Sequence, residues 1–351
     1  MKPAPIRAFT AASTKDDFCV LYMPYGIGQL NIVTQMALQS SFDSYVYFDT
    51  DDLEVISAEF PKLHFIRHAL DVETILERFS RIVTSFSFRH RSLPPEIHGL
   101  IERAQNLRIP IVDVPHGLFQ PGRNMVDTTR IIDIASSSNG IGDIIPSFAD
   151  THVCWNGADG IGYPRYMPDS TRRRDLVIPK YNVIITNTNW YLYSSEDRRQ
   201  LFRTIIEHIE ARNDELFIWC PHPAENNDER YASIIITRRP RNCLLYGMHK
   251  DIYFDGIHST EDIIAHSSYG ITTLSTCILD FEINNIPVHV FDCDGTSDLV
   301  RGMDDIVTFR KVSDLQNPPR PPKTGLLKQY DPQLFDEILR SAASRSRNTA
   351  R

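Results

Sequence analysis

Short apolar runs that alternate with helical stretches limit the folds open to this chain. The first apolar run covers residues 18–25 and is followed by a glycine turn and a helical pattern of apolar residues over 32–38. Further apolar runs of strand length follow at 45–48, 63–66, 81–86, 109–114, 181–185, 216–220, 243–246, 269–272 and 288–291. Because alternating strands and helices build parallel sheets with helices on both faces, we predict an α/β protein.

The length of the chain sets the number of domains. A chain of 351 residues is too long for one typical domain and suits two. The polar, turn-prone stretch 167–175 is the candidate linker. We therefore predict two Rossmann-like, doubly wound domains that face a cleft. The predicted parts are a disordered N-terminus over 1–16, a first domain over 17–170, a second domain over 176–330, a C-terminal helix over 331–342 and a disordered tail over 343–351.

The charge balance and the cysteines exclude several classes of protein. The net charge is -8, from 37 basic and 45 acidic residues, which argues against nucleic acid as a partner. The six cysteines are scattered singly without a Cys-x-x-Cys pair, so we expect reduced, buried thiols and no zinc site. No signal peptide and no apolar run of about 18 residues is found. We expect a cytoplasmic protein, and peripheral contact with the inner face of the membrane stays open.

Segment 271–292 is the first candidate site. A strand is expected to end near Thr272, and Ser275 and Thr276 then stand at the start of a short helix. Free backbone N–H groups and the helix dipole attract an anion there, and the two hydroxyl groups add donors. The alternative is that Ser275 serves only as a helix cap.

Two histidines follow predicted strands in a similar way. Pro221 and Pro223 flank His222 and restrict its backbone, so the ring has a fixed direction and can bind or protonate a phosphate. In the first domain His116 precedes Gly117, which permits close approach of a substrate, and the imidazole can act as a general base. The alternative for each is a turn or packing histidine without a ligand.

Other motifs are weaker. Gly26 and Gly28 permit close approach of a ligand to the backbone, but the third glycine of a dinucleotide fingerprint is missing, which argues against a nicotinamide cofactor. The acidic stretches 49–52 and 292–294 suggest a metal, yet aspartate is common in turns after strands. We predict neither a metal nor a cofactor.

The order of these motifs resembles the glycerophosphotransferases that build teichoic-acid polymers from CDP-glycerol, which are inverting enzymes of the GT-B glycosyltransferase architecture related to capsule-polymer transferases. The similarity spans roughly residues 109–294. The matching pieces are 116–117, 162–165 with Asp169, 187–190, 221–223, 273–281, Pro287 and 291–292. The resemblance implies an acceptor-binding first domain and a nucleotide-donor-binding second domain.

The resemblance also implies roles for single residues. His116 corresponds to the catalytic base, and Arg165 lies near the donor or the interdomain hinge. The donor-binding residues that it implies are His222, Pro223, Ser275, Thr276, Arg165 and Asn189. The sequence departs from the family after Gly117, where Leu118 stands in place of a Thr-Pro pair, and before His222, where Cys-Pro replaces an arginine motif.

A second resemblance concerns the donor. A His-Pro pair followed by a Ser/Thr pair is also similar to bacterial sialyltransferases and Kdo transferases, which use CMP-sugars. Their acidic base motif is matched in part by residues 158–160, so Asp159 is a rival to His116 as the base.

We therefore predict transfer of a sugar or glycerol phosphate from a cytidine nucleotide, ranked above uridine, to a hydroxyl group of a surface glycan or polymer. The reaction would be inverting and metal-independent, with a glycan or lipid-linked acceptor. One alternative is a sugar-nucleotide 2-epimerase, which needs the same phosphate site and also acidic residues that the sequence does not identify. Another is a degenerate protein that only binds nucleotide or glycan.

Overall fold

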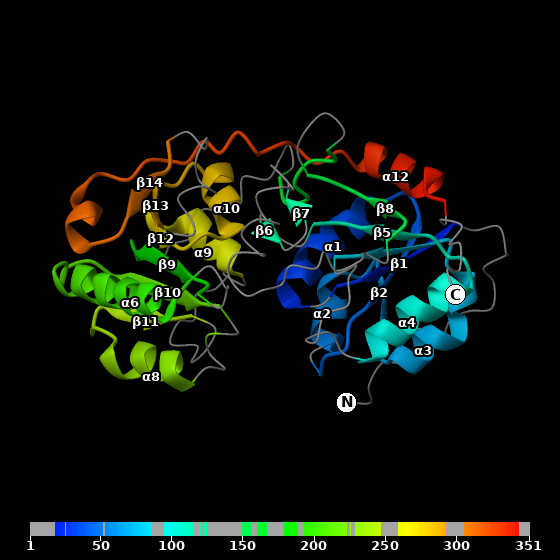
Figure 1. Ribbon diagram of the computed structural model, residues 1–351, viewed down its shortest axis with the longest axis horizontal. Coiled ribbons are helices and arrows are strands. Elements are labelled where there is room, and N and C mark those ends of the chain that lie inside the picture. The colour runs from blue at the N-terminus through cyan, green and yellow to red at the C-terminus, as the bar shows by residue number, and fades with distance from the viewer. Residues whose placement is uncertain are drawn as a thin grey trace.

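The computed structural model consists of two α/β halves that lie side by side along the long axis of the molecule (Figure 1). The structure describes residues 18–24, 26–51, 53–85, 95–115, 119–120, 123–124, 149–155, 160–166, 179–188, 193–222, 225, 229–246, 259–292 and 305–343. The predicted linker 167–175 lies outside these ranges.

The first half is built on a parallel sheet of six strands in the order β3-β2-β1-β4-β5-β8. Its strands are β1 (Cys19–Met23), β2 (Asp43–Tyr47), β3 (His64–Ile66), β4 (Arg81–Thr84), β5 (Ile111–Asp113) and β8 (Thr151–His152). Its helices are α1 (Ile27–Gln39), α2 (Leu53–Glu59), α3 (Ala69–Ile75), η1 (Leu76–Arg78) and α4 (Pro95–Asn106). A short antiparallel pair, β6 (Phe119–Gln120) and β7 (Arg123–Asn124), stands apart from the sheet.

The second half repeats this plan with the strand order β11-β10-β9-β12-β13-β14, again all parallel. Its strands are β9 (Asn182–Thr186), β10 (Phe217–Pro221), β11 (Cys243–Leu245), β12 (Gly270–Thr272), β13 (Val288–Phe291) and β14 (Val307–Phe309). Its helices are α6 (Ser195–Glu210), α8 (Glu229–Arg238), α9 (Thr260–His266), α10 (Cys277–Ile283) and η2 (Val312–Gln316).

Both sheets therefore share one topology. Counted from the first strand of each sheet, the order is 3-2-1-4-5-6, the order of doubly wound nucleotide-binding folds. The strand order reverses between β1 and β4 in the first sheet and between β9 and β12 in the second. Ligands of open α/β sheets bind outside the carboxyl ends of the strands at such switch points. The predicted architecture of two doubly wound domains is confirmed.

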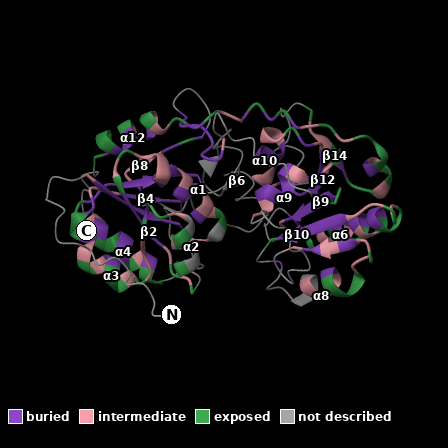
Figure 2. Ribbon diagram, turned by 180° about the vertical axis from the view of Figure 1, so that it is seen from behind, coloured by how far each residue is buried: buried purple, intermediate pink, exposed green. Residues whose placement is uncertain are grey.

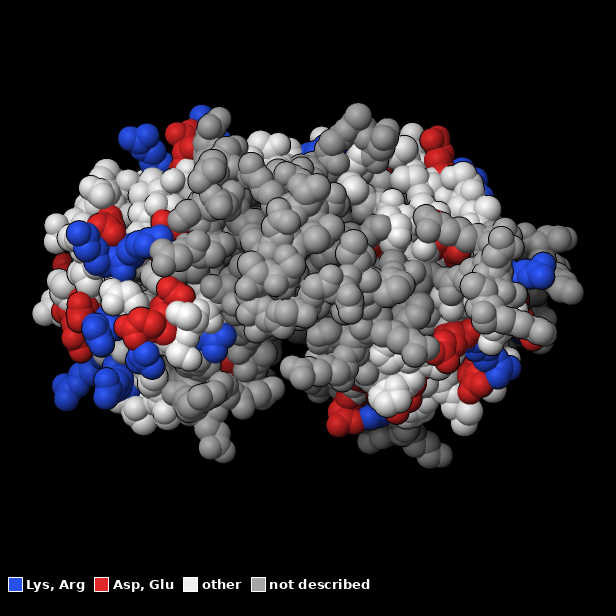
Figure 3. All heavy atoms as spheres, viewed as in Figure 1, with Lys and Arg blue, Asp and Glu red and all other residues white. Residues whose placement is uncertain are grey.

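The central strands are buried because helices cover both faces of each sheet. All five residues of β1 and all five of β9 are buried, and Figure 2 shows the same pattern across both sheets, with exposed residues on the outer sides of the helices. Near-continuous apolar strands are typical of parallel sheets shielded on both sides. On the described surface, basic and acidic side chains are interspersed (Figure 3).

Two segments cross between the halves beside each other. Residues 160–166 lead out of the first sheet, and residues 326–331 lead back to it. Tyr163 N–H donates to Lys328 O at 2.8 Å, and Tyr330 N–H donates to Tyr166 O at 3.0 Å. Gly162 has a φ of +83°, and a Cβ there would lie 2.0 Å from the carbonyl oxygen of Gln329. Only glycine fits this close approach of the two backbones.

The C-terminal helix α12 (Pro332–Ser341) packs on the first domain, although it follows the second domain in sequence (Figure 1). The Asp336 carboxylate accepts hydrogen bonds from Ser40 Oγ at 2.8 Å and from the backbone N–H of Ser41 at 2.8 Å. Arg81 donates to the carbonyl oxygen of Leu339 at 2.6 Å. The last described helix thus packs on the domain that contains β1.

Local predictions have mixed outcomes. Ser194 and Asp197, whose spacing in the sequence is that of a capping box, form one at the start of α6, because Asp197 N–H donates to Ser194 Oγ at 3.1 Å and Ser194 N–H donates to Asp197 Oδ2 at 2.9 Å. Strands β8 and β14 were not predicted, since they span only two and three residues. The expectation of buried thiols is wrong for Cys154, which is exposed. None of the described helices combines the length and apolarity needed to span a membrane.

Candidate functional site

Three loops at the carboxyl edge of the second sheet are tied together by hydrogen bonds. The backbone N–H of His222, after β10, donates to Thr186 O at the end of β9 at 2.9 Å. The backbone N–H of Asn187, after β9, donates to Thr273 Oγ1, after β12, at 3.0 Å. The loops after β9 and β12 flank the switch point of this sheet, so polar groups of three neighbouring loops meet where ligands of such sheets bind.

A buried carboxylate holds two of these loops. Glu225 is 0% exposed, and its Oε2 accepts from Thr186 Oγ1 at 2.7 Å and from the backbone N–H of His222 at 3.0 Å. Its Oε1 accepts from the backbone N–H of Thr188 at 2.8 Å and from Thr188 Oγ1 at 2.6 Å. Glu225 therefore fixes the position of the His222 backbone relative to β9.

His222 itself lies at the carboxyl end of β10, as its sequence context predicts, and it is exposed. Desolvation by the protein atoms packed around the ring lowers the pKa of His222, and the Glu225 carboxylate opposes this effect. The imidazole is therefore neutral at neutral pH and poised to gain a proton when an anion approaches.

Ser275 and Thr276 occupy the predicted position at the start of α10. Both are partly buried, and Ser275 Oγ accepts a hydrogen bond from the backbone N–H of Cys277 at 3.3 Å. Thr276 has helical backbone angles and its side chain makes no capping hydrogen bond. A capping contact of Ser275 is thus present, and α10 is short, with seven residues. Both hydroxyl groups nevertheless stand at the switch point.

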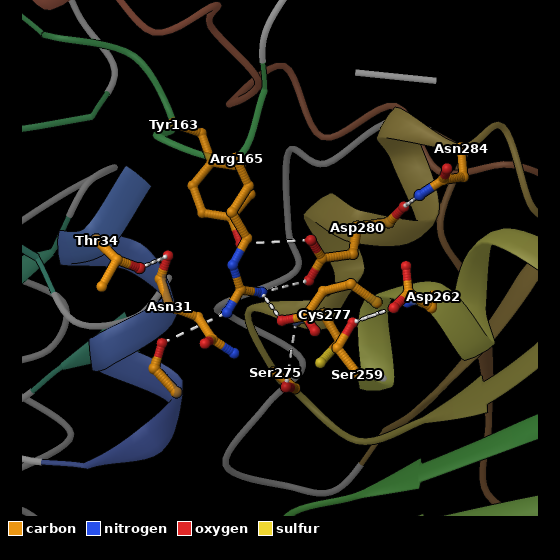
Figure 4. Close-up of polar contacts among 12 residues, drawn as sticks. Asn31, Thr34, Tyr163, Arg165, Ser259, Asp262, Ser275, Cys277, Asp280 and Asn284 are labelled. Atoms are coloured by element: carbon orange, nitrogen blue, oxygen red, sulfur yellow. Dashed lines mark hydrogen bonds and ion pairs between the residues drawn. The ribbon is translucent and has the colours of Figure 1, made fainter. Parts of the chain in front are cut away.

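A buried ionic cluster connects the two domains (Figure 4). The Arg165 guanidinium pairs with Glu261 of α9 and with Asp280 of α10, the latter at 3.2 Å. Arg165 Nη2 also donates to the carbonyl oxygen of Gly28, at the start of α1, at 3.4 Å. Tyr163 OH donates to Asp280 Oδ1 at 3.5 Å. Because α1 follows β1 and α10 follows β12, this cluster joins the switch-point helices of the two sheets.

The cluster keeps Arg165 charged. Burial alone would lower the pKa of Arg165, but Glu261, Tyr163 and Asp280 outweigh burial and raise it. An ion pair of this kind is well satisfied, and removal of one partner leaves a buried charge without a counter-charge. Arg165 lies on the crossover segment between the two halves, and its predicted place near the donor stays a prediction.

The carboxyl edge of the first sheet faces this cluster through the glycine turn. A Cβ added at Gly26 or Gly28 would meet no atom of the described residues within 4 Å. At the end of β5 the buried Asp113 places Oδ2 3.4 Å from Nδ1 of His152, at the end of β8. These two side chains form an acid–base pair that the sequence did not single out.

The predicted site residues are thus partly located. The structure describes Gly26, Gly28, Arg165, His222, Ser275 and Thr276. The predicted residues outside the described ranges are His116, Gly117, Asp159, Asn189 and Pro223. Sequence reasoning missed Glu225, although the spacing of three residues after His222 was a signal. Within the described ranges no group of three or more His, Cys, Asp or Glu side chains is arranged to hold a metal.

No known family model matches the chain, and no curated protein sequence matches it. Solved structures match its fold. For UDP-GlcNAc 2-epimerase of Methanocaldococcus jannaschii, in complex with UDP-GlcNAc and UDP, the TM-score is 0.55 at 11% identity, covering 92% of this chain and 98% of that chain. For the S. aureus MnaA–UDP co-structure, the TM-score is 0.53 at 10% identity, covering 93% and 92%. For UDP-GlcNAc 2-epimerase of Neisseria meningitidis, bound to UDP-GlcNAc, the TM-score is 0.52 at 10% identity, covering 85% and 89%.

At these identities the similarity is one of fold. The chain has the two-domain GT-B architecture over nearly its whole length, and the similar structures include two named UDP-GlcNAc 2-epimerases.

Proposed function

We propose that this chain is an enzyme that acts on a nucleotide-activated sugar, with the nucleotide on the second domain and the sugar between the two sheets. The observation that carries the proposal is the carboxyl edge of the second sheet. There hydrogen bonds tie the loops after β10 and β12 to the end of β9, and these two loops carry His222 and, next along the chain, the hydroxyl groups of Ser275 and Thr276. This set of hydrogen-bond donors suits the phosphates of a nucleotide.

The reaction assigned first is epimerisation at C2 of a UDP-sugar. The similarity in fold to UDP-GlcNAc 2-epimerases over almost the entire chain supports this assignment and favours uridine over the cytidine nucleotide expected from the sequence. Epimerisation requires a group that removes a proton from carbon and a group that returns one. His152, whose Nδ1 lies 3.4 Å from Asp113 Oδ2 at the edge of the first sheet, is our candidate for one of these two groups.

Transfer of a sugar or glycerol phosphate is the second candidate, supported by the motif order over residues 109–294. In that reaction His116, or Asp159 in its place, removes the proton of an acceptor hydroxyl group. Arg165, Asn189, His222, Pro223, Ser275 and Thr276 form the donor side in either reaction. The acceptor of the second candidate is a glycan or lipid-linked hydroxyl, and its donor is a cytidine or uridine nucleotide.

Neither candidate assigns a cofactor. The nucleotide is a substrate, and His222 with the hydroxyl groups of the α10 loop replaces a metal at the phosphates. Activity is therefore expected to survive dialysis against EDTA.

One experiment separates the two reactions. The protein is incubated with UDP-GlcNAc in D2O without an acceptor, and the products are followed by proton NMR. An epimerase forms the C2 epimer with deuterium at C2. A transferase leaves UDP-GlcNAc unchanged and releases free UDP or CMP only when a donor and a glycan acceptor are both present. If UDP, CDP and CMP all fail to raise the thermal midpoint and no product forms, the proposal is wrong.

A further inference from the structure

The Glu225 carboxylate is buried without a cationic partner in the described part of the chain. It is 0% exposed, and its contacts are two hydroxyl groups and two backbone N–H groups. A buried charge normally has a counter-charge or a full set of hydrogen bonds. Glu225 has a full set of hydrogen bonds.

The four contacts occupy both oxygens of the Glu225 carboxylate. Each oxygen accepts two hydrogen bonds. The Thr186 hydroxyl has its own proton directed to Glu225, because Thr186 Oγ1 already accepts from Trp219 Nε1 at 3.1 Å. The Glu225 carboxylate thus lies beside the His222 backbone, and its negative charge raises the pKa of His222.

This charge has a consequence for an anionic ligand. The phosphates of a nucleotide and the Glu225 carboxylate repel each other across His222 unless the ring carries a proton. The other titratable groups of the neighbouring strands do not supply a positive charge. Burial raises the pKa of Cys220, and burial with Asp262 and Glu261 of α9 raises that of Tyr246 to about 12, so both are neutral.

We propose that Glu225 is a positioning residue that holds the His222 loop in place for the nucleotide, a role that rests on the nucleotide site proposed above. Through Glu225, the His222 imidazole takes up a proton when the nucleotide binds. Glu225 touches no phosphate itself. It acts through the His222 backbone N–H, at 3.0 Å from Oε2, and through its charge.

A positioning role of Glu225 that includes the proton makes UDP affinity depend on pH, whereas a merely structural role does not. If binding takes up a proton, UDP affinity is constant at low pH, falls as pH rises between the pKa of free His222 and its higher value in the complex, and is constant again above it. Burial lowers the pKa of free His222 and Glu225 raises it. Loss of the Glu225 charge therefore moves the whole transition to lower pH.

The test is calorimetric titration of the full chain with UDP between pH 5 and 8.5, for wild type, Glu225→Gln and His222→Gln. For E225Q we expect the midpoint of the transition to fall by about one pH unit, with affinity at the acid plateau kept within about threefold. For H222Q we expect the transition to disappear. In the double variant, which combines E225Q with H222Q, UDP affinity should show no pH transition for E225Q to shift.

Glu282→Gln is the matched control. Glu282 Oε2 also accepts two hydrogen bonds, from Thr324 Oγ1 at 2.5 Å and from the backbone N–H of Thr324 at 3.2 Å. Glu282 lies near the C-terminal end of α10, whereas Ser275 and Thr276 stand at its start. E282Q should lower the thermal midpoint and leave the pH midpoint of UDP binding in place.

A loss of affinity in E225Q that is equal at every pH, or an unmoved midpoint, would overturn the proposal. If E225Q does not fold, histidine-selective NMR of the wild type decides, because the pKa of His222 must rise when UDP binds. A wild type that binds neither UDP nor CDP at any pH defeats the nucleotide site itself, which is a separate outcome.

Discussion

Both edges of the second sheet carry histidines, and the two edges surround them differently. At the carboxyl edge His222 is exposed among hydroxyl groups and loop backbone. At the amino edge His208 and His289 are each only 1% exposed. His208 Nε2 lies 3.0 Å from Tyr269 OH, and the rings of His208, Tyr269 and His289 pack edge to face.

The difference separates binding surface from core within one sheet. Burial, together with Arg212, lowers the pKa of both His208 and His289 to about 4, so they are neutral members of an aromatic core. The carboxyl edge has donors that solvent or a ligand can reach. The same residue type therefore serves packing at one edge and, in our proposal, phosphate recognition at the other.

The largest expected effect comes from removing the tie between the carboxyl edge and the first domain. Arg165→Leu leaves Glu261 and Asp280 buried without their counter-charge. Loss of one partner of a buried ion pair costs about 3–5 kcal/mol, so urea unfolding monitored by circular dichroism should show a fall of that size in the free energy of unfolding.

Arg199→Leu is the control for this variant. Arg199 pairs with Glu196 on the surface of α6, with side chains 60% and 70% exposed. Exposed pairs contribute between 0 and about 1 kcal/mol, so R199L should unfold almost as wild type does. Equal, small losses for R165L and R199L would contradict the view that the buried cluster joins the domains.

The next largest effect concerns acid. The folded state keeps His208 and His289 neutral, whereas the unfolded chain protonates them near pH 6.5. Their contribution to stability is complete above pH 6.5 and is lost as pH falls toward 4. Each histidine is expected to cost on the order of 2–3 kcal/mol over that interval, measured as urea midpoints at a series of pH values.

His289→Phe sharpens the contrast between the edges. It keeps an aromatic ring against Tyr269 and Phe309 and removes one titrating group. H289F should lose less stability than wild type between pH 6.5 and 4. Burial also lowers the pKa of His222, but its side chain is exposed and Glu225 opposes the effect, so H222Q should change the wild-type curve less than H289F does. An H289F curve parallel to that of wild type would exclude His289 as a source of acid sensitivity.

Much of the fold could be predicted from the sequence, because buried parallel strands are nearly continuous apolar runs and the helices begin at readable signals such as Ser194 and Asp197. Strands β8 and β14 escaped because a two- or three-residue strand has no periodicity. They form through pairing with β5 and β13, which only the folded chain brings beside them.

Only those features of the site that depend on a single stretch of sequence could be predicted. His222, Ser275 and Thr276 could be placed at carboxyl ends because each stands within a few residues after a strand. The partners of Arg165 could not, since Glu261 and Asp280 follow it by about a hundred residues and meet it only through the crossover. The spacing of Glu225 from His222 does not show that Glu225 is buried, because its burial depends on the hydroxyl groups of Thr186, at the end of β9, and Thr188, just after β9.

The smallest expected effect uses matched tyrosines at the two edges. At the carboxyl edge Tyr193 OH accepts from the backbone N–H of Leu274 at 2.8 Å, and at the amino edge Tyr269 OH bonds to His208. Tyr193→Phe and Tyr269→Phe each leave a buried polar group without this partner, so each should lower the free energy of unfolding by about 1–2 kcal/mol.

The two variants should differ in ligand binding. Leu274 directly precedes Ser275, so loss of the Tyr193 hydroxyl loosens the loop that we assign to the phosphates, and UDP affinity in calorimetric titration should fall several-fold in Y193F. Y269F changes only the sealed edge and should bind UDP as wild type does. Equal UDP affinities in the two variants would mean that the loop after β12 does not hold the nucleotide. The carboxyl edge would then not be a binding edge at that loop, whereas the aromatic cluster at the amino edge would keep its role in packing.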